Sequence, residues 1–273
     1  MTTATERAPA KVNLALHIVG QDPNDYHLLD SLVVFTDTCD VLSIAPSDTM
    51  ALRVDGPFAA GVPIDHRNLV WRAAELAGVA LDITLTKNLP HGAGVGGGSS
   101  DAAAILRAVD RPDLALDLGA DVPVCLSAAP QRMQGIGERI APVPACPSLS
   151  LVLVNPGVHL GTVEVFKALT NKTNPGLSDI PGQADADWLE WLAGQRNDLE
   201  APAMQLAPVI GDVLDTLADA QLARMSGSGA TCFGIYEDKA SAQVAAERIL
   251  REHPDWWVVA CQPIGADDQA AEA

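Results

Sequence analysis

A glycine-rich loop between a strand and a helix constrains this chain more than any other feature. The loop runs from Pro90 to Ser100 and reads Pro-His-Gly-Ala-Gly-Val-Gly-Gly-Gly-Ser-Ser. Because glycine has no Cβ, the backbone can adopt positive φ angles and several N–H groups can converge on one anion. A helix that begins at the loop adds its positive dipole end. The sequence therefore predicts a loop that holds phosphate.

The residues on both sides of the loop indicate regular structure. Apolar and polar residues alternate over 81–86, which predicts a half-buried strand. After the loop, residues 99–101 (Ser-Ser-Asp) are types that cap helices, and the alanine-rich stretch 102–108 favours a helix. A flexible surface linker is the weaker interpretation, because linkers seldom join a clean strand to a capped helix.

Two familiar phosphate loops match the pattern only in part. A Walker A loop ends in Gly-Lys-Ser or Gly-Lys-Thr, whereas Gly98 is followed directly by Ser99. The spacing from Gly92 to Gly97 matches a dinucleotide-binding fingerprint, but residues 87–90 separate it from the strand, and a Rossmann loop turns more tightly. A dinucleotide-dependent oxidoreductase is one alternative function.

Charge limits the partners that we expect. The 273 residues carry a formal net charge of −18. Nucleic acids are bound by clustered Lys and Arg, so we expect no nucleic-acid partner. A polyanionic small molecule has to be held by backbone donors and by a few chosen cations such as Lys11 and Lys87.

Cysteine usage and hydropathy predict a cytoplasmic protein without a membrane segment. The five cysteines are odd in number and form no Cys-x-x-Cys pair, so we expect neither a disulfide framework nor a zinc site. Residues 140–163 lack Asp, Glu, Lys and Arg, but their prolines argue against a spanning helix. The N-terminus lacks the apolar stretch of a signal peptide, so we expect a cytoplasmic location. We expect disorder only at residues 1–7 and 265–273.

In the first part of the chain, alternation over 11–18 predicts a strand with one apolar face, which points Lys11 and Asn13 the same way. The elements predicted after it are a turn at 20–26, a strand at 32–44 interrupted at 37–40, and a helix at 67–77.

Prolines at 142–147 mark the best boundary between two parts. Beyond them, three predicted strands (149–154, 231–236 and 256–261) alternate with three predicted helices (188–194, 209–220 and 240–253). The second part is therefore predicted to form an α/β layer of its own, with domains of residues 1–145 and 146–273.

Three short segments contain residue types suited to chemistry. Lys11 and Asn13 can orient a hydroxyl or a phosphate, and an edge strand with solvated polar residues is the alternative. Tyr26 and His27 can stack on and hydrogen-bond a base, although a tyrosine in a turn often only covers the core. Asp121 lies in Gly-Ala-Asp-Val-Pro, in a loop or at a helix end. It can accept a hydroxyl proton near a transferred phosphate, or cap a helix.

Together with the small-residue turn at 226–231, for which a tight hairpin is the alternative, these segments resemble the GHMP small-molecule kinases. Lys-Val-Asn at 11–13, Tyr-His at 26–27 and Gly-Ala-Asp-Val-Pro at 119–123 resemble the branch that phosphorylates 4-diphosphocytidyl-2-C-methyl-D-erythritol. The other matching segments are 88–101, 135–138, 154–157, 166–169, 197–200 and 225–230. The resemblance implies an α+β fold of two domains, an N-terminal ribosomal-protein-S5-like ATP-binding domain and a C-terminal ferredoxin-like α/β sandwich.

The resemblance also implies an activity in the non-mevalonate route to isoprenoid precursors. The γ-phosphoryl group of ATP would pass to the 2-hydroxyl of the acceptor, with Mg²⁺ accompanying the nucleotide. Asp121 would be the base, which accepts the proton late because an aspartate of pKa about 3.9 cannot ionise an alcohol outright. Lys11 would polarise that hydroxyl and keep Asp121 ionised.

Binding roles follow from the same resemblance. Tyr26 and His27 would recognise the cytosine, and Asn13 would help to hold the acceptor near Lys11. The residues that would wrap the ATP phosphates are Pro90, His91, Gly92, Ala93, Gly94, Val95, Gly96, Gly97, Gly98, Ser99 and Ser100.

The chain departs from the family pattern at three points. Only residues 111–118 link the loop helix to Asp121, about one helix of a dozen residues less than usual; we expect the geometry of Asp121 to survive. Asn-Asp at 24–25 replaces Asp-Gly, so the aspartate must adopt the backbone conformation of that glycine. Gln-Arg at 195–196 replaces an aromatic residue, so one face of the base is open, or Trp188 or Trp191 covers it.

Two alternatives share the fold. Another GHMP kinase acts on mevalonate, homoserine or a sugar, and such acceptors need no base-stacking pair like Tyr26 and His27. A sensor that binds ATP without turnover needs neither Lys11 nor Asp121.

Overall fold

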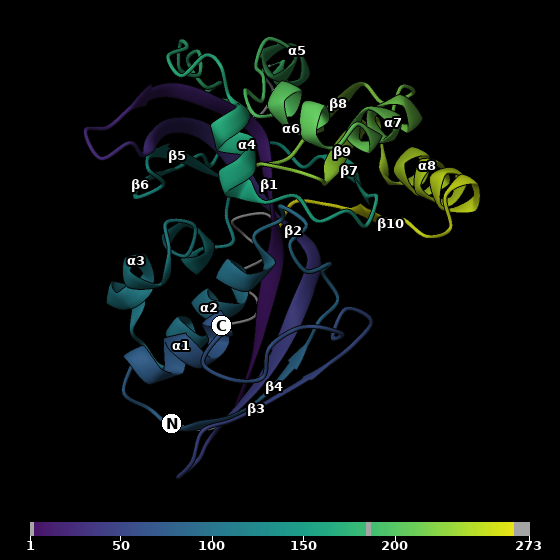
Figure 1. The fold of residues 1–273 in the computed structure, drawn as a ribbon. Helices are drawn as coiled ribbons and strands as arrows, with labels where there is room; N and C mark the ends of the chain where they lie inside the picture. The colour runs from purple at the N-terminus through teal and green to yellow at the C-terminus, as the bar shows by residue number, and fades with distance from the viewer. Residues whose placement is uncertain (1–2, 184–186, 265–273) are drawn as a thin grey trace.

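A long antiparallel hairpin connects the two halves of the molecule (Figure 1). The computed structural model describes residues 3–183 and 187–264. The hairpin consists of β1 (Ala4–Gln21) and β2 (His27–Pro46). Its register shifts at three places along β1, and such bulges bend a strand and change which way its side chains point. The hairpin can therefore lie in one sheet and pack against another.

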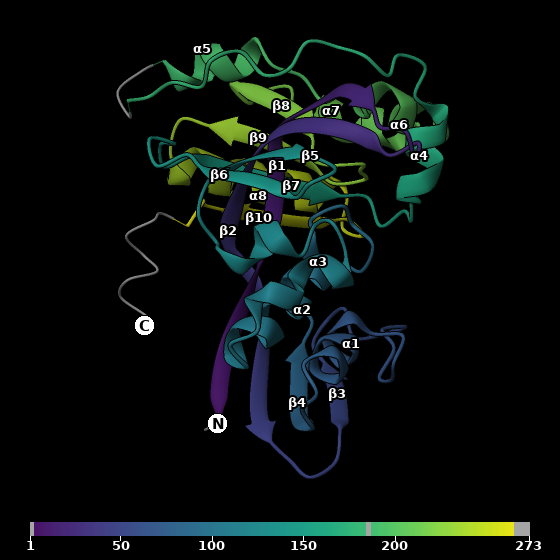
Figure 2. The same cartoon turned by 90° about the vertical axis from the view of Figure 1, so that its left-hand side faces the viewer.

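The first sheet has the strand order β3-β4-β2-β5-β6, with β1 paired to β2. Its other strands are β3 (Ala51–Asp55), β4 (Leu81–Thr86), β5 (Gln131–Gly135) and β6 (Arg139–Pro142). Two helices, α1 (Leu69–Leu76) and α2 (Gly97–Ala108), cover one face of its lower part (Figure 2). The alanine side chains of α2 allow close approach to the sheet, and the one-turn helix α3 (Ala115–Leu118) follows.

The second sheet is antiparallel, with the order β10-β7-β9-β8. Its strands are β7 (Ser150–Asn155), β8 (Leu222–Met225), β9 (Cys232–Tyr236) and β10 (Trp257–Cys261). Its helices are α4 (Thr162–Ala168), α5 (Trp188–Ala193), α6 (Glu200–Leu206), α7 (Val209–Thr216) and α8 (Lys239–Glu252). One core joins this sheet to the hairpin and α5, and another joins it to α4, α6, α7 and α8. No helix within the described residues is long and apolar enough to cross a membrane.

Most predicted elements are present. The strand at 81–86 is confirmed residue for residue, and the helix at 67–77 and the strands and helices of the second part are confirmed apart from their ends. The sequence patterns did not predict β3, β5, β6, β8, α4 or α6.

Two expectations for the hairpin are wrong and one is confirmed. The strand β2 is continuous through 37–40, because Asp40 is buried in an ion cluster rather than exposed in a turn. The strand predicted at 11–18 is present within β1, with Val12 and Leu14 in the core shared with the second sheet, and its polar side chains are buried rather than solvated. Residues 4–7 are not disordered but pair with 41–44 of β2. The predicted disorder at 1–2 and 265–273 lies outside the described residues.

The chain passes from β6 to β7 at the predicted boundary between residues 145 and 146. Because β1 and β2 pack against the second sheet, residues of the first part belong to the second core. Division of the chain at this point stays a prediction.

Candidate active site

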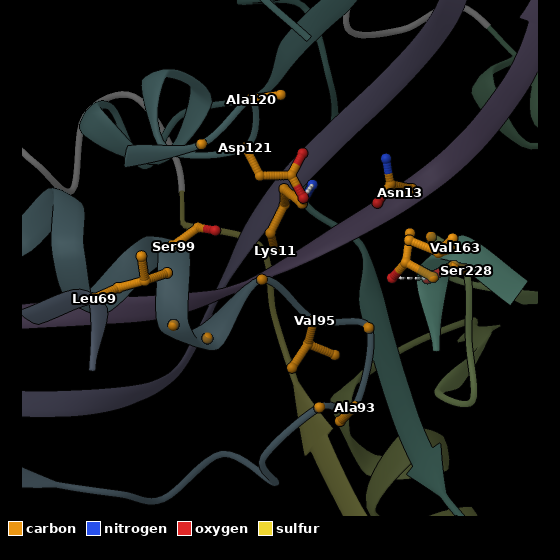
Figure 3. Close-up of a pocket in the computed structure, with 18 of the residues that line it drawn as sticks. Lys11, Asn13, Leu69, Ala93, Val95, Ser99, Ala120, Asp121, Val163 and Ser228 are labelled. Atoms are coloured by element: carbon orange, nitrogen blue, oxygen red, sulfur yellow. Dashed lines mark hydrogen bonds and ion pairs between the residues drawn. The ribbon is translucent and has the colours of Figure 1, made fainter. Parts of the chain in front are cut away.

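Both halves contribute to one cavity of about 1300 Å³. Its lining includes residues of β1, the glycine loop, the segment 119–121, α4 and the turn at 227–228. Cavities for one drug-sized ligand occupy about 300–1,000 Å³, so this cavity has room for two ligands. Figure 3 shows its central part.

The glycine loop has the backbone conformation of an anion-binding nest. Gly92, Gly94 and Gly96 have φ angles of 70°, 75° and 68°, and they alternate with Ala93 and Val95, which have negative φ. Such alternation makes successive N–H groups converge. Among the residues that the structure describes, the N–H groups of this stretch have no hydrogen-bond acceptor. These N–H groups are therefore available to donate hydrogen bonds to a ligand.

Hydrogen bonds from the second half of the molecule hold the glycine loop at its Ala93 carbonyl. This oxygen accepts hydrogen bonds from Thr231 Oγ1 at 2.6 Å and from the Thr231 N–H at 3.3 Å. Asn155 Nδ2 donates to Thr231 Oγ1 at 2.9 Å. A Cβ on Gly94 would lie 2.3 Å from the Gly229 carbonyl oxygen, so only glycine allows this approach.

The helix α2 begins at Gly97, with Gly96 as its N-cap in the left-handed conformation. Residues 99–101, predicted to cap the helix, lie within its first turns instead. A Cβ on Gly96 would lie 3.2 Å from Lys11 Cβ, because the lysine stem packs against this position. The positive end of the helix therefore faces the loop beside Lys11.

Lys11 and Asp121 meet at this end of the cavity. Lys11 Nζ lies 2.9 Å from Asp121 Oδ2, with the lysine side chain 4% exposed and the aspartate side chain 46% exposed. Figure 3 shows the two side chains pointing toward each other, with Ser99 nearby. The Lys11 N–H also donates to the Val95 carbonyl at 2.8 Å, which ties β1 to the glycine loop. Despite its short link of 111–118, the chain brings Asp121 to Lys11.

The Asn13 side chain is held so that its oxygen stays free. Ser31 Oγ donates to the Ala15 carbonyl at 2.6 Å and accepts from Asn13 Nδ2 at 2.8 Å. Asn13 Oδ1 is buried and has no partner in the described part of the chain. The arrangement presents a hydrogen-bond acceptor to the cavity, next to Lys11 along β1.

Tyr26 and His27 line another end of the same cavity. The Tyr26 side chain is exposed, whereas His27 Nε2 is buried and has no partner among the described residues. The His27 ring lies 4.8 Å from the Phe166 ring, centroid to centroid. Burial, together with the charge of Lys172, lowers the pKa of His27. A neutral imidazole with one free nitrogen can hydrogen-bond a ligand.

Asp25, just before this pair, has a φ of 67°, the left-handed conformation expected where relatives have glycine. Trp188 and Trp191, considered as cover for a base, do not line the cavity. They pack in the core beneath α5 instead. The aromatic residue beside His27 is Phe166, which sequence analysis placed in a matching segment without a role.

Lys87, expected to act as a phosphate-binding cation, is buried between two aspartate side chains. Its ammonium group pairs with Asp40 and, at 2.9 Å, with Asp101. The other Asp40 oxygen accepts from the N–H groups of Asn88 and Leu89, the residues that lead into the loop. Burial raises the pKa of Asp101 to about 8. The cluster neutralises Lys87 and supports the entry to the glycine loop.

Most of the predicted site residues share the cavity. Residues 90–99, Lys11, Asn13, Tyr26, His27 and Asp121 all line it, whereas Ser100 is fully buried within α2 and does not. Phe166, Lys167, Lys172 and residues of the segments 61–63 and 67–69 also line the cavity, although no site was predicted at these positions. Only 166–169 carried a signal, as part of the family resemblance.

Comparison with known proteins agrees with this geometry. Residues 68–127 match the GHMP kinases N terminal domain, and residues 183–255 match the GHMP kinases C terminal. A Paracoccus denitrificans protein named 4-diphosphocytidyl-2-C-methyl-D-erythritol kinase is 54% identical, covering 93% of this chain and 95% of the relative. Its namesake from Dinoroseobacter shibae is also 54% identical, covering 92% of each chain.

Solved structures share the fold. A crystal structure of 4-(cytidine 5'-diphospho)-2C-methyl-D-erythritol kinase superposes with a TM-score of 0.78 at 33% identity, covering 96% of this chain and 100% of the other. Homoserine kinase from Cytophaga hutchinsonii has a TM-score of 0.65 at 16% identity, covering 97% and 95%, and shows the fold alone. The predicted two-domain α+β architecture is confirmed. The chain belongs to the GHMP kinase family, in the branch of the 4-diphosphocytidyl-2-C-methyl-D-erythritol kinases.

Proposed function

We propose that this protein transfers the γ-phosphoryl group of ATP to the 2-hydroxyl of 4-diphosphocytidyl-2-C-methyl-D-erythritol. The observation that carries the proposal is the Lys11–Asp121 pair, 2.9 Å apart, in a cavity that also holds an anion nest and the Tyr26–His27 pair. Relatives about half identical over nearly the whole chain carry that enzyme name. Their similarity favours this acceptor over mevalonate, homoserine or a sugar.

The two charged residues divide the work of proton transfer. Asp121 is accessible from the cavity, so its carboxylate can accept the hydroxyl proton as the phosphoryl group transfers. Lys11 is buried beneath it and is fixed to the glycine loop through its own N–H. Its ammonium group lies 2.9 Å from the Asp121 carboxylate and stabilises the negative charge that develops on the acceptor oxygen and the phosphoryl group.

The triphosphate lies against the nest of residues 92–96 and the N-terminus of α2, where free N–H groups and the helix dipole favour an anion. In a chain of net charge −18, these neutral donors hold the phosphates without many cations. The Ser99 hydroxyl is a hard oxygen donor beside the loop, so it fits Mg²⁺ entering with the nucleotide. Bound there, the ion would neutralise charge on the phosphates.

The far end of the cavity suits a nucleoside. Tyr26 offers an exposed ring for stacking, and His27 offers a buried nitrogen without a partner. Asn13 offers its free oxygen to a hydroxyl between that end and Lys11. A cytidine-containing acceptor uses all three, whereas mevalonate or homoserine leaves the Tyr26–His27 end empty.

Product analysis with a panel of acceptors tests the proposal. We expect ATP-dependent, Mg²⁺-dependent phosphorylation of 4-diphosphocytidyl-2-C-methyl-D-erythritol and none of mevalonate or homoserine. Chelation of Mg²⁺ should stop the reaction. Turnover of another alcohol with no reaction on the cytidyl acceptor would overturn the assignment.

A further inference from the structure

Two lysines at the nucleoside end of the cavity have no role in the mechanism above. Lys167 and Lys172 both line this end, and neither forms an ion pair within the described part of the chain. The other Lys and Arg side chains that line the cavity are each paired with a carboxylate, as Lys11 with Asp121, Lys87 with Asp40 and Arg67 with Asp65.

Lys172 is held beside His27 by the segment that carries it. Two residues further on, the N–H and Nδ2 groups of Asn174 donate to the Ile18 carbonyl at 3.0 and 3.1 Å. Asn174 Nδ2 also donates to Asp198 Oδ2 at 3.0 Å. The charge of Lys172 acts on His27, where it helps to lower the pKa. This lysine therefore belongs to the site although it lies outside any helix or strand.

Lys167 comes from the last turn of α4, directly after Phe166. Because the Phe166 ring contacts the His27 ring, Lys167 lies at the same end of the cavity. Asp25 is the acidic residue of this end, so two lysines against one aspartate leave it with a net charge of +1. Such a local excess is notable in a chain whose net charge is −18.

A positive subsite here matches the order of groups in the acceptor. Its nucleoside would lie at Tyr26 and His27, and its alcohol at Lys11 and Asp121, so its diphosphate must lie between the two. The nest of the glycine loop is taken by the triphosphate of ATP. The acceptor diphosphate therefore has to be neutralised by other cations. Lysine ammonium groups without an acidic partner can attract its phosphate oxygens.

We propose that Lys167 and Lys172 bind the diphosphate of the acceptor and thereby select a nucleoside diphosphate ester over an uncharged alcohol. The inference rests on the proposed function, since it takes the acceptor from there. It assigns these lysines to binding and not to the chemical step.

Calorimetric titration with cytidine, CMP and CDP tests the proposal, with the ATP site filled by a non-hydrolysable ATP analogue. Wild type should bind CDP at least tenfold more tightly than cytidine. The Lys167→Met, Lys172→Met double variant should lose most of that difference while binding cytidine as before, and the matching Arg variants should restore it. Lys239→Met, at an exposed lysine of α8 outside the cavity, is the matched control and should change nothing.

Kinetics give a second readout. In the double variant the KM for the acceptor should rise at least tenfold, while kcat and the KM for ATP stay within about twofold. Equal loss of cytidine and CDP binding, or an unchanged preference for CDP, would overturn the inference. Failure of wild type to phosphorylate the cytidyl acceptor would instead refute the proposed function. The binding comparison of CDP with cytidine does not depend on turnover, so it would still test whether the two lysines bind a diphosphate.

Discussion

Replacing Thr231 with valine tests whether the second half of the molecule holds the glycine loop in place. Valine keeps the shape of threonine and removes only the hydroxyl. That hydroxyl is buried, donates to the Ala93 carbonyl at 2.6 Å and accepts from Asn155 Nδ2 at 2.9 Å. After the change, the Ala93 carbonyl retains the Thr231 N–H, whereas Asn155 Nδ2 keeps only its 3.5 Å contact with Ala93.

The size of the effect follows from these bonds. A lost buried hydrogen bond costs about 1 kcal/mol, and a buried amide left without a partner costs about 1–3 kcal/mol. We therefore expect Thr231→Val to lower the free energy of unfolding by about 2–4 kcal/mol. Because the Ala93 carbonyl lies in the phosphate loop, the KM for ATP should also rise, and the KM for the acceptor should change less.

Urea unfolding and steady-state kinetics measure both effects. Thr231→Ser is the matched control, since it keeps the hydroxyl and removes one methyl group, which costs about 0.8 kcal/mol. A Thr231→Val protein within about 0.5 kcal/mol of wild type, or a serine variant as unstable as the valine variant, would refute the reasoning from these hydrogen bonds.

Three further changes probe other parts of the site. Gly94→Ala places a Cβ 2.3 Å from a backbone oxygen and should abolish ATP binding, measured by calorimetry. Gly78 is the control, because it has a similar φ of 70° but open space around it. Gly78→Ala should cost only about 1–2 kcal/mol of backbone strain and keep the affinity for ATP. Burial raises the pKa of Asp101 from 3.8 to about 8, so the folded state binds its proton more tightly, and the stability this provides at acidic pH is lost as pH rises through about 8. Urea unfolding from pH 5 to 9 should show that loss in wild type relative to Asp101→Asn, and parallel profiles would contradict it. Asn13→Ala removes the amide oxygen that has no partner among the described residues. The KM for the acceptor should rise about tenfold, which corresponds to about 1.4 kcal/mol of binding free energy, and the KM for ATP should not change. A selective rise in the KM for ATP would contradict this role of Asn13.

Local patterns in the sequence predicted the elements with strong periodicity. Alternation over 81–86 and the alanine-rich run after the loop depend only on neighbouring residues, so both were found. The continuity of β2 through Asp40 depends on Lys87, which is distant in the sequence, and no local pattern shows that pairing. Short strands such as β8, with four residues, are stabilised by the sheet around them and have too few residues to show a period.

For the candidate site, too, the sequence predicted the residues in recognisable motifs and not those placed by tertiary contacts. Lys11, Asp121 and the glycine loop lie in short segments with recognisable motifs, and the structure brings them together. Lys172 lies in an irregular segment, and its place in the cavity depends on hydrogen bonds from Asn174 to β1 and to Asp198. Tertiary contacts of this kind leave no spacing or periodicity in the sequence.

The central claim is that Asp121, held by Lys11 beside the phosphate loop, accepts the proton of the acceptor hydroxyl. Measuring kcat for Asp121→Asn with ATP and 4-diphosphocytidyl-2-C-methyl-D-erythritol tests it most directly, because asparagine has nearly the same shape and cannot take the proton. Positioned general bases contribute about 10²–10⁴ in rate, so kcat should fall by about that factor while both KM values stay within a few-fold of wild type. An Asp121→Asn protein that retains wild-type kcat would contradict the account.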